Sequence, residues 1–174
     1  MDERNMQHGV DWIGDKIDGY IATEKYNGCR AYWDGKNLWS RGGIKINIPT
    51  AWRRALPAGI HLDGEIYDGV DGLYRCGGFI RSSRATPSMR FMVFDCPAAK
   101  GNYLDRLKAA KKYEGGPLKV VPGKTIAGLN EAKILLAKII KRRGEGLVMR
   151  KPDIKYRAGR TAEILKLKAI LAGQ

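Results

Sequence analysis

Lysine side chains stand at positions where they could bind phosphate or act as nucleophiles. Lys25 comes three residues before Gly28, at the end of a predicted strand, where a glycine permits close approach to the backbone. Lys166 and Lys168 alternate with leucines, so in a strand both amines project from one face and the leucines from the other. An amine attacks only in its uncharged form, which neighbouring cations favour. Each pattern is weak alone, because an isolated lysine is usually solvated and the Leu-Lys alternation also suits an ordinary edge strand.

Two glutamates beside glycines are candidates for metal binding. Glu65 follows Asp63-Gly64 and Glu145 precedes Gly146, and carboxylate oxygens are hard ligands that suit magnesium. On its own, Glu65 is more simply a surface acid in a hairpin, and Asp63 a turn residue. Phe94 ends an apolar run and, by itself, is more simply a core residue. The cysteines, tryptophans and histidines gain no chemical role, and the wide cysteine spacing argues against a structural zinc site.

Short strands must position these residues. The first hundred residues contain five Asp-Gly pairs, which favour tight turns, between short runs rich in β-branched and aromatic residues. The clearest hairpin joins residues 29–33 and 37–41 through Asp34-Gly35-Lys36. Further strands are predicted at residues 20–25, 60–67, 89–94, 146–150 and 163–168.

Two helices are predicted, at residues 103–113 and 131–143. For the second, Asn130 is the expected N-cap and Gly144 the expected end, and Lys141-Arg142-Arg143 lie in the last turn, where the helix dipole favours cations. Mostly antiparallel sheets with a few helices indicate the α+β class in a single domain.

The charge is unevenly distributed. The chain has 174 residues and a formal net charge of +14 from 32 basic and 18 acidic side chains. Residues 1–99 hold 13 basic and 12 acidic residues and residues 100–174 hold 19 and 6, so +13 of the +14 lies in the second part. Such a field attracts a phosphate backbone, although a solvated, solubilising surface explains it about equally well. No apolar run approaches the roughly 18 residues of a membrane span, and no secretory signal opens the chain, so a cytoplasmic location without membrane binding is expected.

Six ordered segments give the chain a resemblance to a known family. They are Thr23-Glu24-Lys25-Tyr26-Asn27-Gly28-Cys29-Arg30, Ser40-Arg41-Gly42-Gly43, Leu62-Asp63-Gly64-Glu65-Ile66-Tyr67, Phe91-Met92-Val93-Phe94-Asp95, Glu145-Gly146-Leu147-Val148-Met149-Arg150 and Leu165-Lys166-Leu167-Lys168. In their order and spacing the chain resembles the covalent nucleotidyltransferases, and among them the small ATP-dependent DNA ligases of bacteria and phages. The resemblance implies an ATP-grasp-like adenylation domain, built of antiparallel sheets flanked by a few helices, over residues 1–174.

The resemblance also implies roles for individual residues. Lys25 would attack the α-phosphate of ATP, with Lys166 and Lys168 on that phosphate. Glu65 would bind ribose or metal, and Glu145 would coordinate the metal near the α-phosphate, the metal being Mg²⁺ or Mn²⁺. Phe94 would be the platform under adenine, with Val148 as the opposite wall, and Thr23 and Glu24 would contact the nucleotide. Arg30 and Arg41 would contact the ribose, the phosphate or the nick end. Asn27 would also lie at the nucleic-acid end.

The chain departs from the family pattern at two points. Asn27 stands where DNA ligases and capping enzymes usually have aspartate, so the shape is kept and the negative charge is lost. This departure gives some weight to RNA as a substrate. The chain also ends six residues after Lys168, so no C-terminal OB-fold domain is expected within it.

The expected activity is therefore ATP-dependent sealing of nicked duplex DNA by a monomer. An RNA ligase is the alternative within the same chemistry, and a capping guanylyltransferase is a further one. From another class, the chain could be a non-catalytic module that binds nicked or single-stranded nucleic acid through its basic surface.

Overall fold

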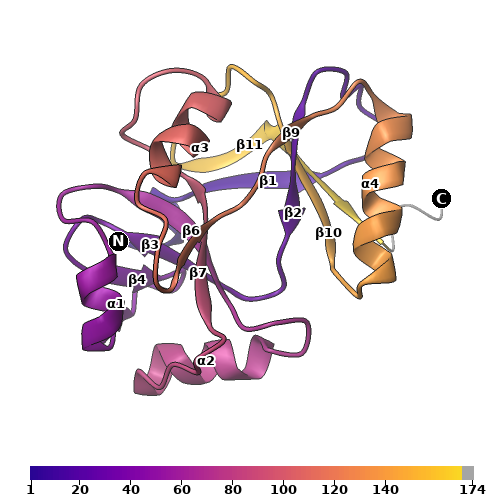
Figure 1. Cartoon of the computed structure of the whole chain (residues 1–174). Coiled ribbons are helices and arrows are strands. Elements are labelled where there is room, and N and C mark those ends of the chain that lie inside the picture. Colours follow the sequence, from indigo (N-terminus) through magenta and orange to yellow (C-terminus); the bar gives the residue numbers. More distant parts are fainter. Residues whose placement is uncertain (170–174) are drawn as a thin grey trace.

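Two β-sheets form the centre of the molecule in the computed structural model, which describes residues 1–169 (Figure 1). The first, sheet A, has the strand order β1-β11-β10-β2-β9. Its strands are β1 (Gln7–Asp11), β11 (Gly159–Lys168), β10 (Gly146–Arg150), β2 (Ile21–Lys25) and β9 (Lys124–Thr125). The pair β1/β11 is parallel and the other pairs are antiparallel, so the N-terminal strand is held by the last one.

The second, sheet B, has the order β5-β4-β3-β6-β7-β8. Its strands are β5 (Lys45–Ile46), β4 (Leu38–Ser40), β3 (Cys29–Trp33), β6 (Leu62–Tyr67), β7 (Arg90–Asp95) and β8 (Leu118–Val120). Only β7/β8 is parallel. The α+β class with mostly antiparallel sheets is thus confirmed.

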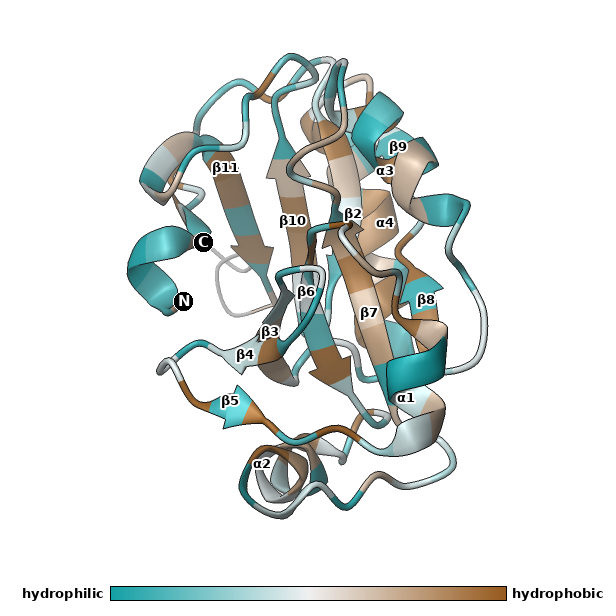
Figure 2. Ribbon diagram, turned by 90° about the vertical axis from the view of Figure 1, so that its left-hand side faces the viewer, coloured by the Kyte–Doolittle hydropathy of each residue, from teal (hydrophilic) through white to brown (hydrophobic). Residues whose placement is uncertain are grey.

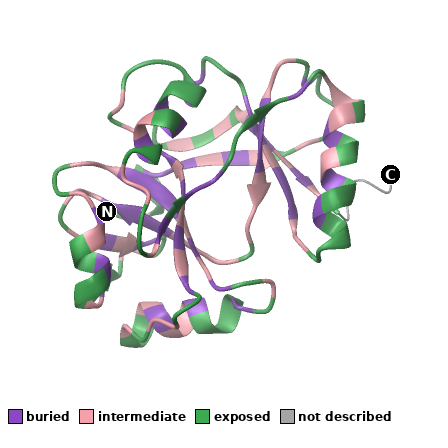
Figure 3. Ribbon diagram, viewed as in Figure 1, coloured by how far each residue is buried: buried purple, intermediate pink, exposed green. Residues whose placement is uncertain are grey.

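Helices cover the outer sides of the sheets. They are a short 3₁₀ turn, η1 (Glu3–Asn5), followed by α1 (Thr50–Ala55), α2 (Leu73–Ser82), α3 (Tyr103–Lys111) and α4 (Leu129–Lys141). Helix α3 lies against β7 and β8, and α4 lies against β10. Exposed residues gather on the helices and loops, whereas most residues of the central strands are buried (Figure 3). Within residues 1–169, no helix is both long and apolar enough to cross a membrane.

The two faces of sheet A have different neighbours. Leu147 and Met149 of β10 and Leu165 and Leu167 of β11 are buried with α4 in one apolar cluster. Ile164 instead belongs to the larger cluster that is dominated by sheet B. Strand β11 alternates between apolar and polar residues in Figure 2, as the Leu-Lys pattern predicts. The leucines therefore anchor β11 under α4, and its lysines point to the side that faces sheet B.

All predicted strands and helices are present, and the errors are at their ends and in short elements that were missed. All predicted strands exist, and β3 and β10 have the predicted bounds. The helix expected to be capped by Asn130 begins earlier, with Gly128 as N-cap, and Arg143 rather than Gly144 takes the left-handed conformation after its end. Gly144 is instead needed for space, because a Cβ there would lie 2.5 Å from the Ile139 side chain. Seven elements were not predicted: η1, β1, β5, α1, α2, β8 and β9.

Candidate functional site

A cavity of about 540 Å³ opens between the two sheets, within the usual size range of small-ligand sites. All predicted site residues except Lys168 line it: Thr23, Glu24, Lys25, Asn27, Arg30, Arg41, Glu65, Phe94, Glu145, Val148 and Lys166. Segments that are far apart in the sequence thus converge on one hollow.

Sheet A presents its cavity residues in two neighbouring rows across the strands. In the first row, Val148 is paired with Thr23 on one side and Lys166 on the other. In the second row, Gly146 lies between Lys25 and Lys168. A Cβ at position 146 would lie 2.3 Å from the Leu167 carbonyl oxygen, so the close strand approach requires glycine here. Because position 146 is glycine, no side chain lies between Lys25 and Lys168 in this row.

The amine of Lys25 is held by a carboxylate that directly precedes the neighbouring strand, β10. Its Nζ donates to Glu145 Oε1 at 2.7 Å, and the two side chains are 23% and 29% exposed. Burial lowers the pKa of Lys166, and the nearby charges of Lys25 and Lys168 lower it further. Sheet A therefore supplies neighbouring lysines whose charges disfavour the charged form of Lys166.

Lys168, although it belongs to the second row, does not line this cavity. Its Nζ is 3.4 Å from Asp11 Oδ1, and its side chain is 36% exposed. The expectation that Lys166 and Lys168 point to the same face agrees with their alternation with buried leucines, but in the free protein only Lys166 lines the cavity.

Glu65 lies on β6, on the sheet B side of the cavity. Its Oε1 accepts a hydrogen bond of 3.2 Å from the backbone N–H of Gly28. Burial raises the pKa of Glu65 to about 7, although Arg30 and Lys25 oppose the shift. Within residues 1–169, no three His, Cys, Asp or Glu side chains gather into a closed metal site. Two carboxylates on one cavity instead suit an open Mg²⁺ or Mn²⁺ site that is completed by water and phosphate.

Asp63 is a buried anchor and not the turn residue that its Asp-Gly pair suggested. It lies inside β6, at a point where the register with β7 shifts, and its side chain is fully buried. Its oxygens accept from both Nε and Nη2 of Arg30, each at 2.7 Å. Burial alone would lower the pKa of Arg30, but the charge and hydrogen bonds of Asp63 outweigh it and raise that pKa. The pair fixes the guanidinium bidentately beside the cavity.

Phe94 and Arg150 form another wall of the cavity. The guanidinium of Arg30 lies 4.8 Å from the centre of the Phe94 ring, and that of Arg150 lies 5.1 Å from it. Arg150 is buried, donates to Thr23 Oγ1 at 3.1 Å, and leaves its Nε without a partner among the described residues. Sequence reasoning missed Arg150, although it ends the segment that begins at Glu145.

The remaining predicted residues lie at the rim. Asn27 is exposed. Arg41, 59% exposed, donates to Glu3 at 2.8 Å. Glu24 pairs with Arg142 at 2.5 Å, and Arg143 pairs with Asp71 at 2.9 Å, so two members of the basic trio at the end of α4 have structural partners. His8 also lines the cavity and was given no role from sequence.

Gly28 has a structural role within the protein. A Cβ at this position would lie 1.9 Å from the Ile66 carbonyl oxygen, so the glycine lets the turn after β2 pass close to β6. The close approach that glycine permits here is thus to the backbone of β6, beside the cavity that Gly28 also lines.

Comparison with known proteins agrees with this geometry. The chain is 28% identical over 158 residues to a DNA ligase of Haemophilus influenzae, across 87% of this chain and 59% of that protein. Among solved structures, one described as a Lig E DNA ligase matches with a TM-score of 0.82 and 27% identity, covering 94% of this chain and 68% of that one. The chain has the fold of a DNA ligase nucleotidyltransferase domain.

A second solved structure supports the nucleotidyltransferase fold. The DNA ligase-adenylate of Chlorella virus matches with a TM-score of 0.77 and 24% identity, over 94% of this chain and 68% of that one. No protein-family model matches the chain. The chain spans about 59% of the length of the curated relative that it matches.

Proposed function

We propose that the chain is the catalytic core of an ATP-dependent DNA ligase that forms a covalent lysyl-AMP and seals nicks in duplex DNA. The observation that carries the proposal is the placement of Lys25, whose Nζ faces the shared cavity 2.7 Å from Glu145. Similarity to a DNA ligase and to solved ligase domains supports DNA as the substrate.

In the first step, Lys25 Nζ attacks the α-phosphorus of ATP. A phosphorus–nitrogen bond forms, the bond to the oxygen that bridges to the β-phosphate breaks, and pyrophosphate leaves with that electron pair. The amine must lose a proton before it attacks, and the Glu145 carboxylate lies within hydrogen-bond distance to accept it. Lys166, which lines the same cavity, neutralises negative charge on the phosphate.

Two further transfers complete sealing. A 5′-phosphate oxygen at the nick attacks the phosphorus of lysyl-AMP, the phosphorus–nitrogen bond breaks, and Lys25 takes up a proton. The 3′-hydroxyl then attacks the activated 5′-phosphorus, loses its proton, and AMP leaves. Arg30 and the rim residues Arg41 and Asn27 are assigned to the nucleotide sugar and the nick end.

The nucleotide base is assigned to the wall formed by Phe94, with Val148 opposite it. Thr23 and Arg150 lie beside this wall, and the unpartnered Nε of Arg150 makes it a donor for the edge of the purine. Mg²⁺ or Mn²⁺, when bound, would be held by Glu145 and Glu65 with the nucleotide phosphates and would neutralise the charge that develops on them.

The test is incubation with α-labelled ATP and a divalent cation, followed by denaturing electrophoresis and intact-mass spectrometry. The wild type should carry AMP and Lys25→Ala should not, while Lys36→Ala, an exposed turn lysine, should be labelled like the wild type. Label that persists in Lys25→Ala would show that Lys25 is not the nucleophile. A wild type that is not labelled would refute the proposed activity.

Substrate arms separate the alternatives. Nicked duplex DNA should be sealed faster than nicked or single-stranded RNA, and ATP should label the protein in preference to GTP. Faster RNA sealing would instead identify an RNA ligase, and preferential GTP labelling a capping enzyme. Nucleic-acid binding without any adduct would identify a non-catalytic binding module.

A further inference from the structure

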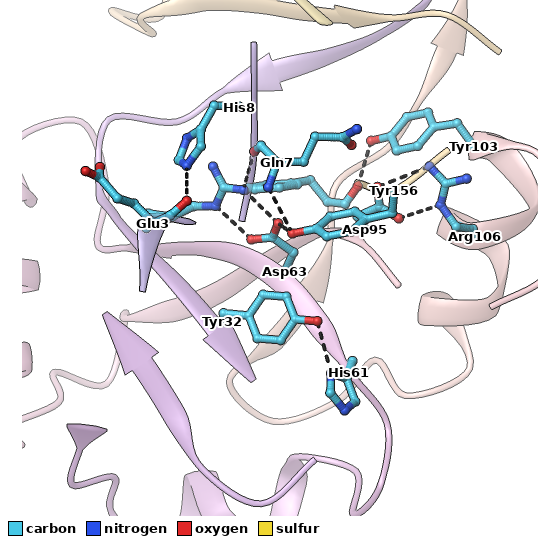
Figure 4. Close-up of polar contacts among 12 residues, drawn as sticks. Glu3, Gln7, His8, Tyr32, His61, Asp63, Asp95, Tyr103, Arg106 and Tyr156 are labelled. Carbon is cyan, nitrogen blue, oxygen red and sulfur yellow. Dashed lines mark hydrogen bonds and ion pairs between the residues drawn. The ribbon is translucent and has the colours of Figure 1, made fainter. Parts of the chain in front are cut away.

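Tyr156 lies outside the six ligase-like segments, in the loop that joins β10 to β11. Its hydroxyl donates to Asp63 Oδ2 at 2.5 Å and accepts from the backbone N–H of Gln7 at 3.3 Å (Figure 4). Burial, the charge of Asp63 and the hydrogen bond to it all raise the pKa of the phenol, so it remains a donor at neutral pH. The side chain thus connects the last loop of the fold to β6 and to β1.

These contacts close a ring of four residues. Arg30 donates Nε and Nη2 to Asp63, and Nη2 also donates to the Gln7 carbonyl at 2.9 Å. Gln7 returns to Tyr156 through its backbone N–H, and its side-chain amide donates to the Lys155 carbonyl at 2.8 Å. Four separate chain segments therefore share one network whose centre, Asp63, is fully buried.

The network holds Arg30 in a fixed orientation and leaves one part of it free. Nε and Nη2 are engaged, whereas Nη1 has no hydrogen-bond partner within residues 1–169. The side chain is 17% exposed, lines the cavity and lies over Phe94. A guanidinium fixed on one edge presents its remaining donor in a single direction, which reduces the entropy lost when a ligand is bound.

We infer that Tyr156 is a positioning residue that orients Arg30, through Asp63, for nucleotide binding. The inference rests on the proposed function, because it takes ATP as the ligand of the cavity. Without the phenol hydroxyl, Asp63 loses one of its donors and the guanidinium can shift along the carboxylate. The affinity for nucleotide then falls, while the attacking amine, which belongs to sheet A, is unaffected.

Adduct formation at varied ATP concentration tests this inference. Tyr156→Phe should raise the ATP concentration that gives half the limiting rate by about tenfold, as expected for loss of a hydrogen bond to a charged group. The limiting rate itself should change less than about twofold, since a mobile Arg30 weakens ground-state binding only. Tyr32→Phe is the matched control, because it removes a buried phenol hydroxyl on β3 that bonds His61 at 3.0 Å outside the cavity; it should change neither parameter.

A second comparison distinguishes a positioning role of Tyr156 from a role in packing. Arg30→Met with Asp63→Leu replaces both charges by apolar side chains, which is better tolerated than leaving one charge unpaired. Adding Tyr156→Phe to this double variant should have less than about a twofold effect, because the residue that it orients is gone. An undiminished effect in that background, or an unchanged half-saturating concentration in folded Tyr156→Phe, overturns the inference.

Folding and the proposed function are controlled separately. If Tyr156→Phe does not fold, Gln7→Leu, which loses only the bond to Lys155, should raise the half-saturating concentration about threefold, and no change would overturn the inference. A wild type that forms no adduct refutes the proposed function. A wild type that does so beside an unaffected Tyr156→Phe refutes only the role of Tyr156.

Discussion

The two sheets supply different kinds of side chain to the same cavity. On sheet A, Lys25 and Glu145 are 23% and 29% exposed, and each has the other as its ion-pair partner. On sheet B, Asp63 is fully buried and accepts from both Arg30 and Tyr156. The Lys25–Glu145 pair is therefore a single, replaceable contact, whereas Arg30 and Asp63 belong to a closed network.

This difference matches what each wall must do in the proposed reaction. A nucleophile has to leave its carboxylate partner, bond to phosphorus and return, so a single partly exposed contact is an advantage. The guanidinium of Arg30, assigned to the nucleotide sugar, must stay where it is, and a buried network holds it. Substitutions on sheet A should thus separate activity from stability, whereas substitutions on sheet B should change both.

Lys25→Ala should give the largest difference between the effect on activity and the effect on stability. Adduct formation should fall by at least about 10³-fold because no other amine replaces the nucleophile. The free energy of unfolding should change by less than about 1 kcal/mol, since a partly exposed ion pair contributes little. Rate measurements and urea titrations on the same preparation check both; a loss of several kcal/mol would mean that sheet A is also structural.

Asp63→Ala should show the opposite behaviour. It leaves the guanidinium of Arg30 buried without its carboxylate, which typically costs about 3–5 kcal/mol. The melting temperature should drop by roughly 10 °C for a domain of this size. Thermal unfolding followed by circular dichroism measures it, with Asp11→Ala, an exposed acid at the end of β1, as control. A melting temperature equal to that of the control would remove the structural role of the network.

The sheet A side of the site was more predictable from sequence than the sheet B side. The period of two in Leu165-Lys166-Leu167-Lys168 determines which face each residue occupies once the segment is a strand. The partner of Asp63 is not encoded locally, because Arg30 and Tyr156 come from other segments and Asp-Gly pairs usually indicate turns. The buried acid was therefore mistaken for a turn residue.

The missed elements have similar physical causes. Strand β1 pairs in parallel with β11 at the opposite end of the chain, so no local hairpin signal announces it. Helix α2 contains Gly77-Gly78 in its interior, which lowers its helix propensity, and its buried Phe79 and Cys76 stabilise it through packing. Arg150 was missed because its role depends on Phe94 and Tyr103, which come from distant segments.

Lys166→Met sharpens the contrast within sheet A. Burial and the charges of Lys25 and Lys168 lower the pKa of Lys166, so keeping this lysine charged costs the folded protein some stability at neutral pH. Removing the charge should raise the free energy of unfolding by less than about 1 kcal/mol while slowing adduct formation about 100-fold. Parallel unfolding and labelling assays test this, with Lys36→Met expected to change neither. A clear loss of stability in Lys166→Met would contradict the pKa argument.

The titration of Glu65 gives the smallest expected effect, and it tests whether a buried charge on sheet B also lowers the stability of the folded protein. Its pKa is raised by burial from 4.5 to about 7, so between these values the folded protein binds a proton that the unfolded chain has released. The associated stability is complete below about pH 4.5 and is lost as the pH rises towards 7. In the presence of a chelator, the free energy of unfolding of the wild type should fall by about 2 kcal/mol relative to Glu65→Gln between pH 4.5 and 8. Glu163→Gln on β11 should follow the wild type. Parallel curves for wild type and Glu65→Gln would mean that water or Arg30 already compensates the carboxylate, and that this wall of the cavity, unlike the other at Lys166, holds its charge without a cost to folding.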